Sequence, residues 1–185
     1  MDTERADPDD LAVLRVAFGV DDDSSAGLGW TAVKAFEAEH GVVLPEPYRT
    51  CVADITDGSY AGPPEYGLMP LGELPDDWGD DRPERDLGRP FPLTKTWLWE
   101  EDPRAFDEIQ PILGQVFDHG SIVLGSDGCG MNWHLVVTGP HRGHVWSISG
   151  EGAAPFGAEF GFTTAAAGFA GWVRQWAENR PWFDA

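Results

Sequence analysis

The sequence predicts a single α+β domain, in which N-terminal helices and a C-terminal helix pack on a mostly antiparallel sheet. Three observations support this class: helical stripes of apolar residues at both ends of the chain, strand-like alternation between them, and turn-rich connections between the strands. With 185 residues and 42% hydrophobic content, the chain is long enough to bury the core of such a domain.

The N-terminal third is predicted to hold three helices. Their apolar residues recur every three or four positions, as the buried side of a helix requires. Glycines end the first helix near Gly19, the second at Gly41 and the third before Gly58. The stripes consist of Leu11, Leu14, Phe18, Trp30, Val33, Phe36, His40, Tyr48, Cys51, Val52 and Ile55.

A fourth helix is predicted near the C-terminus. Thr163 or Thr164 would cap its start, because a hydroxyl oxygen accepts a hydrogen bond from a backbone N–H of the first turn. Pro181 would stop it. We expect the helix to pack on the sheet face that bears Trp146 or Trp133. Its stripe consists of Phe169, Trp172, Val173 and Trp176.

The middle of the chain carries the strand patterns. Residues 121–125 form a compact apolar run, and residues 131–138 alternate between two faces with the period of a strand. Residues 144–149 follow after a Gly-containing hairpin loop. Shorter strands are expected at 66–71 and near 91–94. Strands joined by such short turns form an antiparallel meander.

The composition is dominated by negative charge. Asp and Glu number 32 against 12 Lys and Arg, a net charge of −20. This field repels nucleic acid and anionic membrane, whose binding relies on Lys and Arg, and it attracts basic proteins. The alternative is that the acidity serves solubility alone. The chain lacks an apolar run of membrane-spanning length and a signal-peptide pattern, which predicts a cytoplasmic protein.

Residues 73–90 are predicted to form a long acidic loop. Its prolines and glycines exclude a continuous helix or central strand. We expect Trp78 to be exposed among carboxylates, and interface hot spots favour such a tryptophan. The predicted partner-binding residues are therefore Asp76, Asp77, Trp78, Asp80 and Asp81. The alternative interpretation is a solvated loop that binds nothing.

Cysteine and histidine residues suggest a chemical alternative. Cys129 with His134, His141 and His144 could form a zinc site or a nucleophile set, but their spacing matches no paired zinc-ligand pattern. The GSDGCG segment that contains Cys129 is typical of a turn between strands. Cys51 lies on an apolar stripe, as a small hydrophobe does. We therefore expect no metal, no cofactor and no catalytic residue, with a Cys/His-dependent enzyme as a weaker alternative.

A series of short motifs runs from about Trp30 to about Trp176. It begins with FE-xx-HG-xx-LP-xx-Y at 36–48 and continues through Asp57-Gly58, PLGEL at 70–74 and the segment 120–148. In this order the motifs resemble the SUKH superfamily, which includes eukaryotic cell-wall-synthesis regulators and many bacterial immunity proteins. The motif residues are Phe36, Glu37, Gly41, Leu44, Pro45, Tyr48, Gly58, Trp146, Trp172 and Trp176.

The resemblance implies both a domain organisation and a function. A SUKH-like domain would occupy residues 29–180, with the acidic loop 73–90 inserted, after an acidic N-terminal extension at 1–28 that holds a short helix. Bacterial relatives typically bind and neutralise secreted polymorphic toxins, many of them nucleases or nucleic-acid deaminases, and the family has no catalytic motif. The resemblance thus implies a non-enzymatic immunity protein that binds a toxin domain. The net charge of −20, and not the resemblance, predicts that this partner is basic. A stand-alone regulatory or scaffold protein is the alternative.

Overall fold

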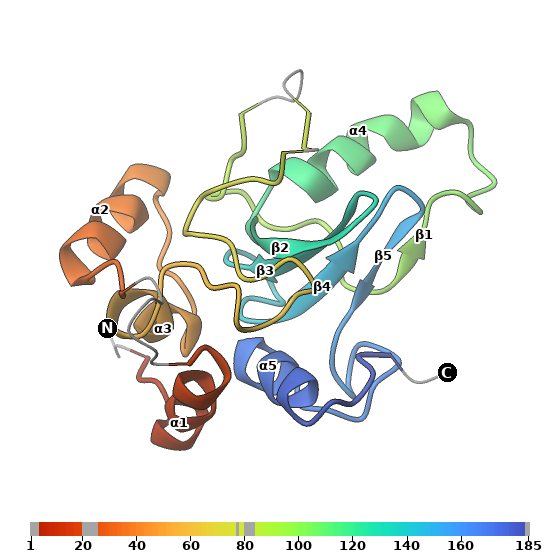
Figure 1. Cartoon of the computed structure of the whole chain (residues 1–185). Coiled ribbons are helices and arrows are strands. Elements are labelled where there is room, and N and C mark those ends of the chain that lie inside the picture. The colour runs from red at the N-terminus through yellow and green to blue at the C-terminus, as the bar shows by residue number, and fades with distance from the viewer. Residues whose placement is uncertain (1–3, 20–25, 77, 80–83, 184–185) are drawn as a thin grey trace.

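The computed structural model describes residues 4–19, 26–76, 78–79 and 84–183. Within these residues, five helices surround a five-stranded antiparallel sheet (Figure 1). The strands lie in the order β1-β5-β4-β3-β2, and each neighbouring pair is antiparallel. The predicted α+β fold class is confirmed.

The sheet consists of a meander with one strand added at its edge. Three strands of the meander, β2 (Ser121–Gly128), β3 (Met131–Val136) and β4 (Val145–Ile148), lie where the sequence predicts them. Two strands are not predicted, namely β5 (Gly152–Pro155) and β1 (Trp97–Leu98). Their sequences, GAAP and WL, are too short to show the alternation that identifies a strand.

The two short strands predicted at 66–71 and 91–94 are not formed. Leu68 makes only an isolated bridge to another loop residue. The backbone N–H groups of Tyr66 and Met69 donate to carbonyls of β2, so the first segment lies along the edge of the sheet. Each segment contains a proline, which has no N–H to donate to a ladder.

Three helices form at the N-terminal side as predicted: α1 (Pro8–Ala17), α2 (Trp30–His40) and α3 (Tyr48–Asp54). A carboxylate oxygen of the residue before α1 accepts a hydrogen bond from its first turn. Gly41 ends α2 in the left-handed conformation, with φ of 66°, which favours glycine because it has no Cβ.

The C-terminal helix α5 (Phe169–Ala177) begins later than the sequence predicts. Its N-cap is Gly168, which makes no side-chain capping bond, so the prediction of a threonine cap is wrong. The Thr163 hydroxyl instead accepts a hydrogen bond from the Ala165 N–H, in a turn before the helix. A threonine hydroxyl can make such local turn bonds as well as helix caps, so its presence does not decide between them.

Helix α4 (Phe106–Asp118) is not among the predicted helices. Pro111 lies inside it, and an internal proline is normally a sign that a helix has ended. Its first turn carries Asp107 and Glu108, whose charges complement the positive end of the helix dipole. Its buried apolar residues, which share one side of the helix, are Ile109, Val116 and Phe117.

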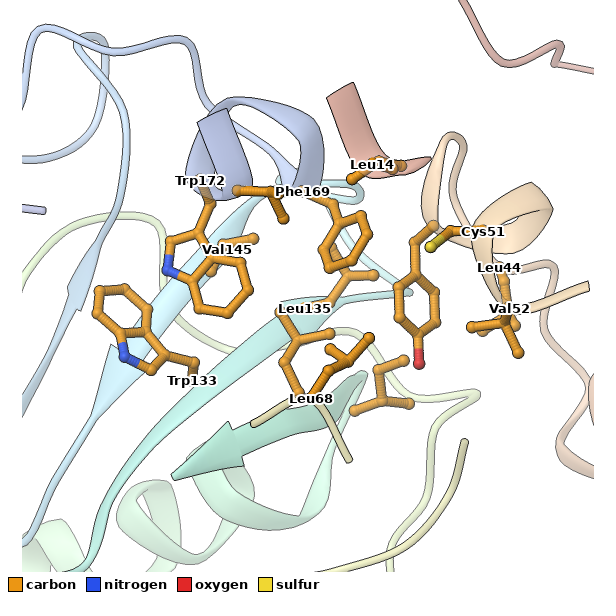
Figure 2. Close-up of a cluster of buried hydrophobic side chains, with 14 of the residues drawn as sticks. Leu14, Leu44, Cys51, Val52, Leu68, Trp133, Leu135, Val145, Phe169 and Trp172 are labelled. Carbon is orange, nitrogen blue, oxygen red and sulfur yellow. The ribbon is translucent and has the colours of Figure 1, made fainter. Parts of the chain in front are cut away.

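Both faces of the sheet are covered. On one face, Phe169 and Trp172 of α5 point toward Leu135 and Val145 of the sheet (Figure 2), and residues of α1 and α3 belong to the same core. The opposite face packs against α4. Successive side chains of β3 point to opposite faces of the sheet. Since both faces are covered, the side chains from Asn132 to Val136 are buried on both sides. The second core contains Trp78, Phe91, Val136, Trp146 and Ile148.

The tryptophans of α5 pack on the face that bears Trp133. The ring centroids of Trp172 and Trp133 lie 5.5 Å apart. Trp182, from the segment after α5, stacks on Trp172 with centroids 5.2 Å apart. Trp146 lies on the opposite face, 5.1 Å from Phe91. Of the two predicted contacts for α5, the structure therefore contains the one with Trp133.

Candidate partner-binding surface

Glu37 of the FE-xx-HG-xx-LP-xx-Y motif forms a partly buried ion pair with Arg49, the residue after the motif, and so links α2 to α3. The Glu37 carboxylate accepts hydrogen bonds from Arg49 Nε at 2.7 Å and from Arg49 Nη2 at 2.8 Å. It also accepts one from the Leu44 N–H at 2.9 Å. The guanidinium carbon of Arg49 lies 5.3 Å from the centre of the Trp30 ring. This pair therefore ties both helices to the connection between them.

Two α3 side chains that have catalytic roles in other proteins are buried here. The ring of Tyr48 packs edge-on against Phe169, with centroids 5.0 Å apart. Burial raises the pKa of Tyr48 far above its usual range, and burial also raises the pKa of the Cys51 thiol to about 12. A thiol with so high a pKa stays protonated at neutral pH and is a poor nucleophile. Both side chains are part of the hydrophobic core.

Asp57 and Gly58, which follow α3, position the loop at residues 59–76. The Asp57 carboxylate accepts a hydrogen bond from the Leu71 N–H at 2.8 Å. Gly58 has φ of 86°, which favours glycine. The Phe36 ring of α2 covers Gly72, where an added Cβ would lie 2.9 Å from the ring. The loop is therefore anchored to both α2 and the end of α3.

A groove of about 510 Å³ lies between this loop and β2, and we call it the tyrosine groove. Tyr60 is 98% exposed and Tyr66 is 66% exposed, and both line it. The apolar lining includes Leu74, which is also exposed. The charged residues of the lining are Glu73 and Asp76, and none of the described lining residues is a lysine or arginine. The groove is thus an exposed aromatic recess of negative charge.

Asp127 on β2 holds one side of the tyrosine groove in place. Its Oδ2 accepts a hydrogen bond from Trp133 Nε1 at 2.7 Å, and its Oδ1 accepts one from the Glu65 N–H at 3.0 Å. The next residue, Tyr66, donates its N–H to a carbonyl of β2. Its ring lies on Gly128, where an added Cβ would be 2.9 Å from the ring. The sheet therefore fixes the position of Tyr66.

The prediction that Trp78 is an exposed anchor is wrong. Its side chain is only 7% exposed and belongs to the core under α4. Its ring packs edge-on against Phe117, with centroids 5.9 Å apart, and the guanidinium carbon of Arg85 lies 5.1 Å from its centre. The loop bends inward at this point because a tryptophan gains more from burial than from exposure.

The structure describes only one of the four aspartates that are predicted to bind the partner. Asp76 is exposed and lines the tyrosine groove. Asp77, Asp80 and Asp81 lie outside the described residues, so their part in binding stays a prediction. Asp76 thereby links the acidic segment of the sequence to the groove.

Strand β3 separates the cysteine and histidine residues of the chemical alternative. Cys129 is exposed in the turn between β2 and β3, which confirms the predicted turn. His141 and His144 lie beyond the other end of β3, and six strand residues span roughly 20 Å. His134 is buried, with Nδ1 3.0 Å from the Ser121 hydroxyl oxygen. His141 and His144 pack against each other, with ring centroids 5.5 Å apart, but the four side chains do not converge on one site.

Metal sites and membrane-spanning helices are both absent from the described residues. Among residues 4–19, 26–76, 78–79 and 84–183, no three His, Cys, Asp or Glu side chains are grouped so that they could hold a metal ion. In the same part of the chain, no helix has the length and apolar character needed to cross a membrane.

Sequence reasoning missed Tyr60 and Tyr66 as surface residues. They lie in the segment SYAGPPEY, which has neither helical nor strand period. The signal that was available is compositional, since the chain has only three tyrosines and two of them stand in one Gly/Pro-rich loop.

Comparison with known proteins agrees with the motif order. The model of the SMI1 / KNR4 family (SUKH-1) matches residues 31–174, which include the ion pair, the loop at 59–76 and all five strands of the sheet. No curated protein and no solved structure gave a match. Because the matched region covers well over half of the chain, this protein belongs to the SMI1 / KNR4 family (SUKH-1).

Proposed function

We propose that this protein is an immunity protein, which neutralises a cognate toxin domain of nuclease type by binding it directly. Members of the family act in general as binding proteins and not as enzymes, and immunity or regulatory roles are consistent with membership. The observation that carries the proposal is the tyrosine groove, an exposed recess that combines two tyrosines with two carboxylates.

The charge of the chain favours a basic partner. A net charge of −20 attracts a cationic protein over several ångströms and speeds their encounter. Nuclease active sites are cationic because they bind phosphates, so an anionic surface is complementary to them. Asp76, with Asp77, Asp80 and Asp81, would contribute to this steering beside the groove.

Exposed tyrosines suit a protein interface. Tyrosine supplies a large, rigid contact surface with few rotatable bonds, and it is enriched among residues that dominate binding energy. Tyr60 and Tyr66 lie on a loop that hydrogen bonds fasten to β2 and to the end of α3. A surface held in this way loses little conformational entropy when it binds.

The experiment is to express the protein together with the product of the gene immediately upstream. The proposal predicts that the upstream protein alone stops growth, that co-expression restores growth, and that the two proteins elute together in gel filtration. If growth stays arrested and the two proteins elute separately, the immunity role is wrong. A regulatory role within the family would then be the better account.

A further inference from the structure

We infer that the tyrosine groove binds an arginine side chain carried by an extended segment of the basic partner. This inference rests on the proposed function, because it names what the partner presents to the groove. The groove volume of about 510 Å³ falls in the range of roughly 300–1,000 Å³ that is usual for ligand sites.

The lining of the groove matches each part of an arginine side chain. Tyr60 and Tyr66 offer exposed aromatic rings, on which a planar guanidinium can stack. Glu73 and Asp76 offer carboxylate oxygens for its N–H donors. Leu74 and its apolar neighbours suit the methylene stem, which prefers to lie along apolar surface.

The molecule already contains the same combination of groups within its own fold. The Asp102 carboxylate accepts hydrogen bonds from Arg104 Nε at 2.9 Å and Nη2 at 2.7 Å. The guanidinium carbon of Arg104 lies 5.6 Å from the centre of the Trp97 ring, and Trp97 Nε1 donates to the same carboxylate. An aromatic ring and a carboxylate therefore bind one guanidinium together. The tyrosine groove presents these two groups without a cation among its described lining residues.

Arginine fits this lining better than lysine. Its guanidinium is planar and donates from a rigid fork, whereas an ammonium is a compact charge that stays strongly hydrated. The Arg49 guanidinium lies 5.3 Å from the Trp30 ring centre, and that of Arg85 lies 5.1 Å from the Trp78 ring centre. In these internal pairs, as in that of Trp97, the cation is an arginine.

The groove is formed before any partner binds. Asp127 fixes the backbone at Glu65, and the Met69 N–H donates to a β2 carbonyl at 2.8 Å. The Asp57 carboxylate fixes the loop further along, at Leu71. A segment that enters the groove therefore meets a prearranged site, which reduces the entropy lost on binding.

The test uses short peptides and the three tyrosines of the chain. The protein is labelled with 3-fluorotyrosine, so that Tyr48, Tyr60 and Tyr66 each give a fluorine NMR signal, assigned with Tyr60→Phe and Tyr66→Phe. Acetyl-Gly-Arg-Gly-amide is then titrated, together with matched peptides that carry lysine or neutral citrulline. We expect the arginine peptide to shift the signals of Tyr60 and Tyr66 and to leave that of buried Tyr48 in place.

Two charge variants locate the effect. Asp76→Asn should lower the affinity for the arginine peptide about two- to fivefold, as the loss of one exposed ion pair does. Glu151→Gln is the matched control, because Glu151 lines a separate recess of about 240 Å³ at the opposite edge of the sheet. The assignment would be overturned if the citrulline peptide shifted the Tyr60 and Tyr66 signals as much as the arginine peptide does, or if the lysine peptide bound with the same affinity. It would also be overturned if Asp76→Asn and Glu151→Gln lowered the affinity for the arginine peptide equally.

The inference and the proposed function can fail separately. If the upstream protein is neutralised equally well by the wild type and by Tyr60→Ala/Tyr66→Ala, the partner binds elsewhere and only the groove assignment is wrong. If the arginine peptide binds the groove but the upstream protein is not neutralised, the groove assignment stands and the immunity role is wrong.

Discussion

Glu37 on α2 and Arg49 on α3 form a two-point ion pair, and the same carboxylate also accepts the Leu44 N–H. Glu37→Gln removes the charge and replaces one acceptor oxygen with a donor group. We expect it to lower the free energy of unfolding by about 1.5–3 kcal/mol, the usual contribution of a hydrogen bond to a charged group. Chemical denaturation measures this change.

The control for this prediction is Glu39→Gln on the same helix. Glu39 is exposed, so its loss of charge should alter stability by less than about 0.5 kcal/mol. Equal stabilities for the two variants would show that the ion pair does not hold α2 against α3.

Trp172→Ala should be among the most destabilising changes in the chain. The side chain is fully buried between Trp133, Phe169 and Trp182. Truncation of a buried tryptophan typically costs about 3–5 kcal/mol, which is a large share of an ordinary domain's stability. Trp176 is only partly buried, so Trp176→Ala should cost less. Melting temperatures that did not change for Trp172→Ala would place α5 outside the core.

The two cysteines should react at very different rates. Cys129 is exposed and Cys51 is buried, so a thiol reagent at neutral pH should label only Cys129 until the protein unfolds. The Cys129 rate should equal that of a free cysteine in a peptide. A much faster reaction would point to an activated thiol and favour the Cys/His-dependent enzyme.

Cys51 should also make stability depend on alkaline pH. Its pKa is raised by burial from 9.0 to about 12 in the folded protein. A raised folded pKa means that the unfolded state loses its proton first as pH increases. The stabilising contribution is therefore complete below about pH 9 and is lost between about pH 9 and pH 12. Cys51→Ala should weaken this part of the pH dependence, as denaturation at several pH values would show.

Neutralising the acidic loop should slow association with the toxin domain. Changing Asp76, Asp77, Asp80 and Asp81 to Asn removes four charges that would steer a basic partner. The effect on the association rate should be largest at low salt, because salt screens exposed charges. An association rate equal to that of the wild type at low salt would assign steering to another surface.

The burial of Trp78 changes what its variant should do. As an exposed anchor, Trp78→Ala would have acted on dissociation of the partner. As a core residue beside Phe117, it should instead lower stability by about 3–5 kcal/mol. Denaturation of the isolated protein distinguishes these outcomes without the partner.

Most of the fold could be predicted where one period dominates a segment. The stripe of α2 and the alternation of β3 are long enough to identify an element. Helix α4 escaped prediction because Pro111 interrupts the usual signal, and β5 because its small residues show no alternation. For α4 and β5, contacts with the rest of the fold determine the secondary structure, and the local sequence alone does not.

The candidate surface was predictable only in part. Asp76 was identified from charge, and it does line the groove. Trp78 was misplaced because a loop sequence does not show which side of it faces the core. Tyr60 and Tyr66 line one groove because the loop that carries them is hydrogen bonded to β2, including Asp127, which is far away in the sequence. Such long-range contacts leave no pattern in a short stretch of chain.

The most direct test of the central claim is the concentration of this protein that halves the activity of the upstream toxin domain. Wild type and Tyr60→Ala/Tyr66→Ala are compared at equal salt, after circular dichroism has shown that both are folded. The account predicts that wild type inhibits the toxin and that the double variant needs at least about a tenfold higher concentration, as loss of about 1.4 kcal/mol implies. Equal inhibition by the two proteins, or no inhibition by wild type, would contradict it.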